Sequence, residues 1–172
     1  MVTLLNLLRS LVKTLHSDGS PGQIAAGIAL GAALGLTPIA NAHNVVVLLL
    51  LAVLNVSFAA GMLAWGVFVP IGFMLDPLFH RVGEWLLVGI PSLRPLWTWL
   101  DNTPGVALTN FNNTIVLGSV VVWLALFIPL YVGSRYGVVR YRATLGQRVV
   151  HSHFYKVLQS SQIYNVYRWF RP

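Results

Sequence analysis

The stretch SPGQIAAGIALGAALGLTP, from Ser20 to Pro38, contains no charged residue and has glycine at every fourth position, at Gly27, Gly31 and Gly35. Ser20 is followed by Pro21, which suits the first helical position, and Gln23 stands three residues after the serine. This pattern predicts a capped helix start. A helix that ends before the final Thr-Pro pair would be roughly 24 Å long, shorter than the ~30 Å hydrocarbon core of a bilayer. The stretch therefore predicts a short helix, rich in small residues, inside a membrane.

The composition of the whole chain supports this interpretation. Hydrophobic residues make up 56% of the 172 residues and charged residues only 9%, whereas average globular chains carry about 25% charged residues. No Asp, Glu, Lys or Arg occurs from Gly19 to Leu75, a stretch far longer than the ~20 apolar residues of one membrane-spanning helix. We therefore expect an all-α, polytopic integral membrane protein. Cysteine is absent, which excludes disulfides, thiolate nucleophiles and cysteine metal sites.

A second apolar run follows the first helix, and the two together predict a hairpin over residues 21–55. The hairpin is either re-entrant, returning to the side from which it enters, or a pair of thin, tilted spans joined by a tight turn. Both arrangements leave its two ends on the same side of the membrane, so charge does not separate them. The polar apex of this hairpin comprises Asn41, His43 and Asn44.

Two longer apolar runs, residues 58–75 and 114–133, predict further spans. The first contains glycines and Pro70, which predict a kink, and we expect it to end at Asp76-Pro77. Between them, residues 77–112 carry both signs of charge and several tryptophans, a composition typical of the headgroup level. This segment predicts an interfacial platform on the non-cytoplasmic side.

The two ends of the chain predict the orientation. Residues 2–17 form an amphipathic pattern suited to the plane of the interface, although packing on the protein's own core is the alternative. The first residues are apolar with bases only afterwards, unlike a cleavable signal peptide, so we expect this start to be retained. The excess of positive charge lies in residues 134–172, which predicts a cytoplasmic tail after a membrane domain over residues 1–133.

The tail combines bases with aromatic side chains, a composition that suits an anionic lipid surface. Positive-inside topology alone also explains these charges, and attachment directly after a span disfavours nucleic-acid binding. The candidate lipid contacts are Arg135, Arg140, Arg142, Arg148, Lys156, Arg168 and Arg171.

The glycine stripe of the first helix is accompanied by a second stripe of alanines. Small residues let helix backbones approach closely in lipid, so we favour a packing surface whose partner is the run 45–54 or another subunit. The alternative is a groove for a lipid chain or a permeation path. The residues of this packing surface or lipid groove are Ala25, Gly27, Ala29, Gly31, Ala33, Gly35 and Pro38.

Candidate chemistry is sparse. Asp76 and His80 are one helical turn apart and make the one plausible acid and base pair, while an acid at a helix start commonly caps it. His43 is a titratable residue at membrane depth and so a functional candidate, although such lone histidines are more often structural. His151 and His153 lack further metal ligands nearby in sequence. We expect no metal, no cofactor and no enzymatic activity.

Several motifs carry a resemblance to a known family. The glycine pattern from Pro21 to Pro38 resembles the opening signature of small bacterial inner-membrane proteins known as domain of unknown function 2062. A subgroup adds Leu15-x-Ser17-Asp18, His43-Asn44, Asp76-Pro77-Leu78-Phe79-His80, Asn102-Thr103-Pro104 and Phe111-Asn112-Asn113-Thr114. The motif residues to which the resemblance gives no role are Asp76, Pro77, His80, Phe111, Asn112, Asn113 and Thr114.

The resemblance implies a location in the bacterial inner membrane and a partner. Genes of this subgroup tend to lie beside one for a larger membrane-anchored envelope protein that looks like a bridge for lipid movement between membranes. We therefore expect a non-enzymatic subunit that anchors or clamps such a protein and meets membrane phospholipid. The alternatives are a stand-alone transporter or lipid flippase that uses the broken hairpin, acting alone or as a homo-oligomer, and, third, a membrane-lipid enzyme centred on Asp76 and His80.

Overall fold

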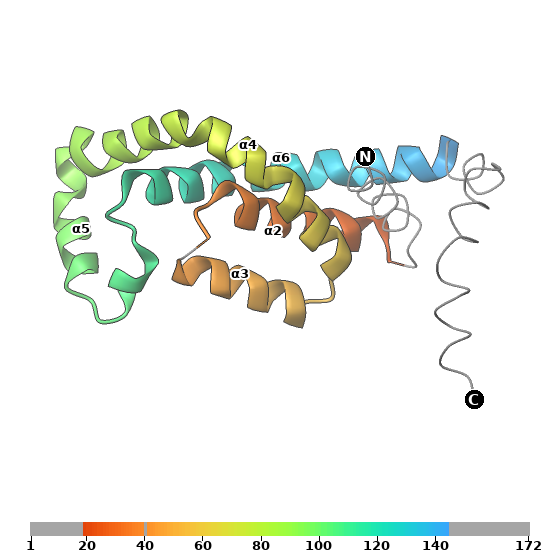
Figure 1. The fold of residues 1–172 in the computed structure, drawn as a ribbon, viewed down its shortest axis with the longest axis horizontal. Helices are drawn as coiled ribbons and strands as arrows, with labels where there is room; N and C mark the ends of the chain where they lie inside the picture. Colours follow the sequence, from red (N-terminus) through yellow and green to blue (C-terminus); the bar gives the residue numbers. More distant parts are fainter. Residues whose placement is uncertain (1–18, 40, 145–172) are drawn as a thin grey trace.

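A computed structural model describes residues 19–39 and 41–144 of the chain, and within these ranges the regular structure is all helical, with no strand. The predicted amphipathic segment 2–17 and the tail beyond Thr144 lie outside the described residues. The elements, shown in Figure 1, are α2 (Pro21–Leu36), α3 (Ala42–Val53), α4 (Phe58–Glu84), the π-helical turn η1 (Trp85–Gly89), the 3₁₀ turn η2 (Pro91–Leu93), α5 (Arg94–Asp101), the 3₁₀ turn η3 (Val106–Thr109) and α6 (Thr114–Thr144).

Helix α2 has the bounds that its sequence predicts. The Ser20 hydroxyl accepts a hydrogen bond from the Gln23 main-chain N–H at 3.2 Å, and the Gln23 side-chain oxygen accepts one from the Ser20 N–H at 2.7 Å. This reciprocal capping box satisfies two N–H groups that the first helical turn leaves free. At the other end Thr37 is extended, with ψ of 148°, as expected for a residue that precedes proline.

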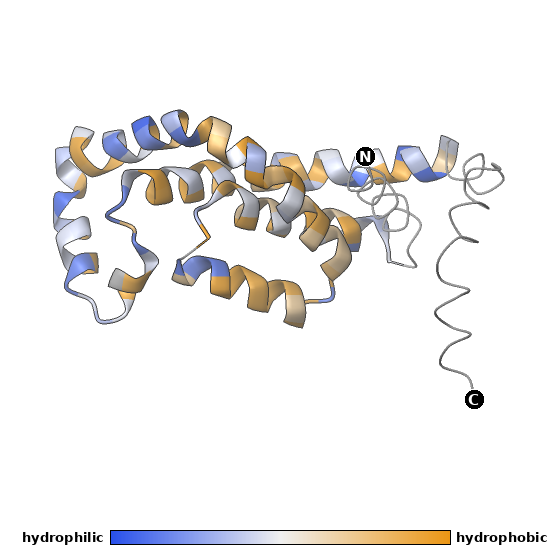
Figure 2. Ribbon diagram, in the orientation of Figure 1, coloured by the Kyte–Doolittle hydropathy of each residue, from blue (hydrophilic) through white to orange (hydrophobic). Residues whose placement is uncertain are grey.

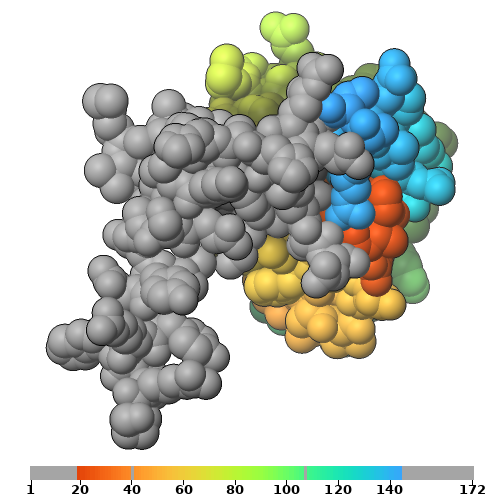
Figure 3. Space-filling model, turned by 90° about the vertical axis from the view of Figure 1, so that its right-hand side faces the viewer, coloured from red at the N-terminus to blue at the C-terminus, as the bar shows by residue number. Residues whose placement is uncertain are grey.

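Helix α2 is the centre of the fold. All residues from Ala29 to Leu36 are buried, as are Ile24, Ala25 and Gly27. In Figure 1 the helix runs between α4 and α6 on one side and α3 on the other, and Figure 3 shows its start in red between α6 and α3. A short helix that is apolar all round is stable when neighbours cover every face, and α2 meets that condition within its own chain.

Helices α2 and α3 form the predicted antiparallel hairpin. Its open end is closed by two hydrogen bonds, because the Gln23 side-chain nitrogen donates to Asn55 Oδ1 at 2.7 Å and the Ser57 N–H donates to the Gln23 carbonyl at 3.0 Å. Helix α3 has only 12 residues, about 18 Å at 1.5 Å per residue. It packs on α2 through Val47 and Leu51.

Two helices run beyond the predicted ends of their spans. Helix α4 does not stop at Asp76-Pro77 but continues to Glu84, and α6 does not stop near residue 133 but continues to Thr144. Proline inside a helix removes one backbone hydrogen bond, which neighbouring helices make tolerable in a membrane. Here the turns after Pro77 pack on α6 through the buried Phe79 and Gly83, so the helix is held beyond the proline. Residues 134–144 of the predicted tail are therefore helical.

In the described part of the chain, two helical segments are long and apolar enough to cross a membrane, Phe58–Gly89 with 32 residues and Thr114–Thr144 with 31. Figure 2 shows apolar residues along α2, the later turns of α3 and the central parts of α4 and α6, with polar residues at the two ends of the molecule and at the start of α3. The short helices around α5 lie at one end, and the described chain ends, Gly19 and Thr144, lie at the other (Figure 1).

Candidate functional site

The glycine stripe of α2 packs against the main chain of α4. A Cβ atom at Gly27 would meet the carbonyl of Ser57, one at Gly31 would meet the carbonyl of Gly61, and one at Gly35 would lie 2.8 Å from the carbonyl of Trp65. Real side chains do not fit at these separations, so glycine is required for the two helices to approach so closely. The expected partner was the run 45–54 or another subunit. The glycines meet the long helix α4 instead, whereas Ala33 of the same packing surface packs with Val47 and Leu51 of the expected run.

A second glycine contact joins α4 to α6, and the sequence interpretation missed it. A Cβ atom at Gly83 would meet the carbonyl of Thr114, and one at Gly118 would meet the carbonyl of Phe79. These two glycines lie on different helices and form no periodic stripe. The sequence therefore carried only a weak signal for this contact, an isolated glycine in each run.

The alanine stripe lies on a fully covered face of α2. Ala25, Ala29 and Ala33 are at most 1% exposed. The indole Nε1 of Trp123 on α6 donates a hydrogen bond to the Ala29 carbonyl at 2.9 Å. The small side chains therefore leave room for a tryptophan to reach the main chain of α2.

The polar apex residues bond to the main chain where α2 ends. Asn41 Nδ2 donates to the Pro38 carbonyl at 2.8 Å, and Asn44 Nδ2 donates to the same carbonyl at 2.7 Å and to that of Ile39 at 3.3 Å. The Thr37 hydroxyl lies 2.7 Å from Asn44 Oδ1. These side chains satisfy carbonyls that the break between α2 and α3 leaves without helical partners.

The structure places His43 differently from its two asparagine neighbours. Its Nε2 atom is buried and makes no hydrogen bond with any described residue. His43 therefore does not join the hydrogen-bond network of Asn41 and Asn44.

The apex also contacts the far end of the molecule. Asn110 Nδ2, in the connection between α5 and α6, donates to Asn41 Oδ1 at 2.5 Å. Asn110 has a positive φ of 52°, a conformation in which asparagine is several-fold enriched over other non-glycine residues. The sequence interpretation missed Asn110, although it directly precedes the Phe111-Asn112-Asn113-Thr114 motif.

An apolar groove of about 350 Å³ lies beside the apex. Its first wall is the end of α2 with residues 37–39, and its second wall comprises Val69, Gly72, Phe73 and Asp76 of α4. Pro38, which the sequence assigned to the packing surface or lipid groove, lines it. Asp76 is the one charged residue of this lining.

The structure does not pair Asp76 with His80. The His80 Nδ1 atom lies 2.7 Å from the Thr114 hydroxyl, and its Nε2 atom lies 3.8 Å from the carboxylate of Glu84. His80 thereby joins α4 to the start of α6, while Asp76 lines the groove. Within the described ranges, no group of three or more His, Asp or Glu residues is arranged to hold a metal ion.

The remaining motif residues lie near the start of α6. Asn113 Oδ1 accepts hydrogen bonds from the Ile115 and Val116 N–H groups at 2.9 and 3.3 Å, which caps the helix. Phe111 stacks on Trp97 of α5, with ring centroids 6.2 Å apart. Asn112, next to the cap, is exposed, as is Pro77 within α4.

Three of the seven candidate lipid-binding bases lie on the last turns of α6. Arg142 donates to the Gly19 carbonyl at 2.9 Å, Arg140 lies over the Tyr136 ring at 5.9 Å, and Arg135 is exposed. Arg142 thus ties the start of the described chain to its end. Arg148, Lys156, Arg168 and Arg171 lie outside the described residues.

A family model for an uncharacterised protein conserved in bacteria, domain of unknown function 2062 (DUF2062), matches residues 6–145. The chain belongs to the DUF2062 family. This DUF2062 chain is also 28% identical over 163 residues to an uncharacterised protein of Treponema pallidum (strain Nichols), covering 93% of this chain and 98% of that protein. No solved structure matches it. The family resemblance is confirmed, and the narrower subgroup stays a prediction.

Proposed function

We propose that this DUF2062 protein is a non-enzymatic subunit of the bacterial inner membrane that holds the membrane anchor of a larger envelope protein and gives phospholipid access to it. The observation that carries the proposal is the outer face of α3. Val45, Val46, Leu49 and Val53 are each more than half exposed, on a helix of about 18 Å. Apolar helices shorter than the bilayer are accommodated by thinning the bilayer or by association with other helices. A partner's anchor helix alongside α3 provides that association.

The roles of the polar side chains support a scaffold. His80 joins α4 to Thr114 of α6, Asn41 and Asn110 join the apex to the α5–α6 connection, and Asn113 caps α6. The first two contacts join separate segments, and the third fixes the start of α6. A rigid frame of this kind suits a protein that positions another chain.

In this proposal both ends of the chain are cytoplasmic. Gly19 and Arg142 lie together, and Arg135 and Arg140 lie on the same last turns of α6, in agreement with the positive-inside rule. The hairpin then enters and leaves on the cytoplasmic side. Its apex reaches the opposite headgroup level, because the path from Ser20 to Thr37 is about 26 Å long at 1.5 Å per residue and because Asn41 bonds to Asn110.

Capture from native membranes in mild detergent tests the proposal. We expect the tagged wild-type protein to recover a larger envelope protein that carries a membrane anchor, identified by mass spectrometry. The double variant Leu49→Trp/Val53→Trp adds bulk to the α3 face that lipid tails accommodate but a packed helix does not, so it should lose that protein. Leu124→Trp/Ile128→Trp, at equal spacing and similar exposure on α6, is the matched control and should retain it.

Recovery of the wild-type protein without a larger chain would overturn the proposal. Equal loss in both double variants would also contradict it, since the α3 face would then have no special role.

A second candidate function is a stand-alone transporter or flippase. The observation that favours it is the groove at the break between α2 and α3, because broken helices line substrate paths in carriers. Purified protein in liposomes would then move labelled phospholipid between leaflets without a partner. Absence of lipid movement under these conditions would exclude this function.

A further inference from the structure

The groove beside the hairpin apex has an acidic rim and an apolar floor. The floor is main chain, because Gly35 and Gly72, which both line the groove, approach so closely that a Cβ atom at Gly72 would lie 2.5 Å from the Gly35 carbonyl. Ile39 and Phe73 stand on the two walls and are 64% and 72% exposed. The groove therefore has an apolar lining with one carboxylate, that of Asp76.

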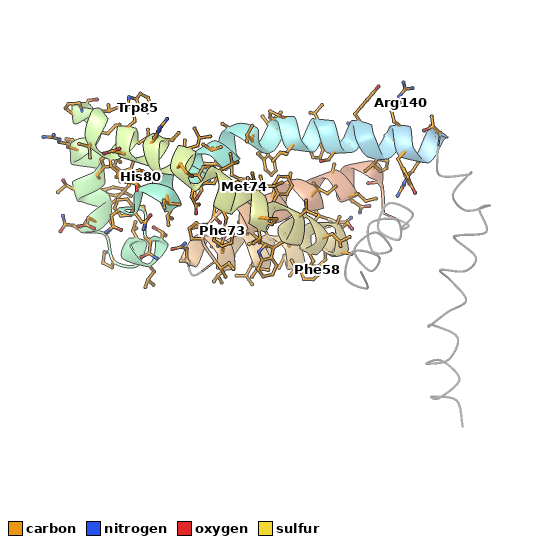
Figure 4. The ribbon with its side chains drawn as sticks, turned by 45° about the horizontal axis from the view of Figure 1, so that its top comes forward. Phe58, Phe73, Met74, His80, Trp85 and Arg140 are labelled. Carbon is orange, nitrogen blue, oxygen red and sulfur yellow. The ribbon has the colours of Figure 1, made fainter. Side chains whose placement is uncertain are left out.

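The position of Asp76 along α4 sets its depth. Eighteen residues separate it from Phe58 at the start of the helix, a path of about 27 Å. This nearly equals the ~30 Å thickness of a hydrocarbon core. Figure 4 shows Phe73 and Met74 between Phe58 at one end of α4 and His80 and Trp85 at the other. Asp76 therefore lies at the headgroup boundary on the side of α5, and the groove extends from it toward the bilayer centre.

Among the described residues, no cation pairs with the Asp76 carboxylate. The His80 imidazole contacts Glu84 instead, and no described residue donates a hydrogen bond to Asp76. Ionisable residues in membrane-spanning segments face a partner or a polar cavity and mark ligand paths. A group of opposite charge brought by a ligand would complete this site.

Width and charge favour a lipid over a protein helix as the occupant. A helix with its side chains is ~10 Å across, whereas the groove of about 350 Å³ is bordered by the end of α2 and one face of α4. A single acyl chain is much narrower than a helix. A phospholipid with an ammonium headgroup places its cation at the boundary and its chain below it, which matches the order of rim and floor.

We propose that this groove binds one ethanolamine-headed phospholipid of the leaflet on the α5 side, with its ammonium on Asp76 and an acyl chain along Phe73 and Ile39. A primary ammonium donates charge-assisted N–H hydrogen bonds to a carboxylate, whereas a quaternary choline has no N–H to donate. An anionic phosphatidylglycerol headgroup would be repelled. The inference rests on the membrane placement in the proposed function, and it names the lipid class that the subunit meets.

Native mass spectrometry of the purified full-length protein tests the inference, with phosphatidylethanolamine, phosphatidylcholine and phosphatidylglycerol of identical chains added singly. We expect the wild type to prefer the ethanolamine lipid about tenfold. Asp76→Asn should bind the ethanolamine and choline lipids equally, and Asp76→Glu should restore the preference. Ile39→Trp, which fills the groove, should weaken binding of every lipid.

Asp101→Asn, an exposed acid at the end of α5, is the matched control and should bind like the wild type. Melting curves of each variant show that it is folded, so that a loss of preference reports on the site. Equal binding of all three lipids by the wild type, or an unchanged preference in Asp76→Asn, would overturn the inference. Recovery of a basic peptide in place of lipid would also overturn it.

The two proposals fail separately, because lipid binding is measured on the isolated protein and partner capture on native membranes. Selective lipid binding without a captured partner retains this inference and removes the anchor-holding role. Capture of a partner together with unselective lipid binding retains the anchor-holding role and removes this inference.

Discussion

Gly31 of α2 and Gly61 of α4 lie so close that a Cβ atom at Gly31 would overlap the Gly61 main-chain carbonyl. The same relationship repeats one turn earlier at Gly27 and Ser57. Helix α2 is therefore fixed to α4 by direct backbone contact, and this contact sets the depth of the hairpin apex relative to Asp76.

Gly31→Ala should destabilise the protein by about 3 kcal/mol, the upper end for overpacking, because a carbonyl inside a helix yields less than a side chain does. The expected readout is a lower melting temperature and less monodisperse protein in detergent. Gly66→Ala on α4 is the control, since nothing lies within 4 Å of its Cβ position, and it should gain up to about 1 kcal/mol from helix propensity. A wild-type melting curve for Gly31→Ala would contradict the close contact.

The contact between α4 and α6 predicts a second matched pair of variants on α6. Gly118→Ala should cost about 1 to 3 kcal/mol, because its Cβ would meet the Phe79 carbonyl. Gly137→Ala has open space at its Cβ position and should not destabilise the helix. Thermal unfolding followed by tryptophan fluorescence compares the two. If both variants melted alike, α4 and α6 would not be packed through Gly118.

Two adjacent asparagines have different roles, because one caps a helix and the other lies on the surface. Asn113→Ala removes the acceptor of the Ile115 and Val116 N–H groups and should cost about 0.5 to 2 kcal/mol. Asn112→Ala, one residue earlier and exposed, should change stability by less than about 0.5 kcal/mol. Denaturation midpoints in detergent measure both variants, and the opposite ranking would show that Asn113 is not the cap.

The hydrogen bond of Trp123 joins α6 to α2, and its contribution to stability can be measured. Trp123→Phe removes the N–H that donates to the Ala29 carbonyl. That carbonyl lies inside α2 and keeps its helical hydrogen bond, so the variant should destabilise the fold by about 0.5 to 1.5 kcal/mol, the net value of one hydrogen bond. Trp99→Phe alters a side chain that is 64% exposed and should have little effect. The measurement is the melting temperature of each variant. Equal melting temperatures would show that the hydrogen bond of Trp123 does not stabilise the fold.

Single cysteines test the proposed topology, and they are clean probes because the chain contains no cysteine. Ser92→Cys near α5 should react with an impermeant maleimide added to intact spheroplasts, whereas Ala143→Cys should react only after permeabilisation. Ile39→Cys, at an exposed site beside the apex, should react from the same side as Ser92→Cys. Protection of Ile39→Cys before and after permeabilisation would place the apex within the hydrocarbon core and favour a re-entrant hairpin.

The local signals in the sequence predicted much of the fold. Ser20, Gln23 and Pro38 set both ends of α2, because capping and proline geometry depend on neighbouring residues alone. The family was also recognised from motifs, and the match over residues 6–145 confirms it. Helices α4 and α6 run past the predicted ends of their spans, and in α4 the packing of Phe79 and Gly83 on α6 overrides the local break at Pro77.

The sequence by itself determined that the chain is apolar and its described part helical, that α2 carries one face of small residues, and that its hairpin has a polar apex. Periodicity specifies a face because it depends on spacing along one helix. Only the tertiary structure decided what meets that face. The contact of Gly31 with Gly61, the hydrogen bond of Asn41 to Asn110 and the place of Asp76 on the groove each join residues of separate segments. Such partners are chosen by which helices pack together, and spacing within a single helix carries no information about them.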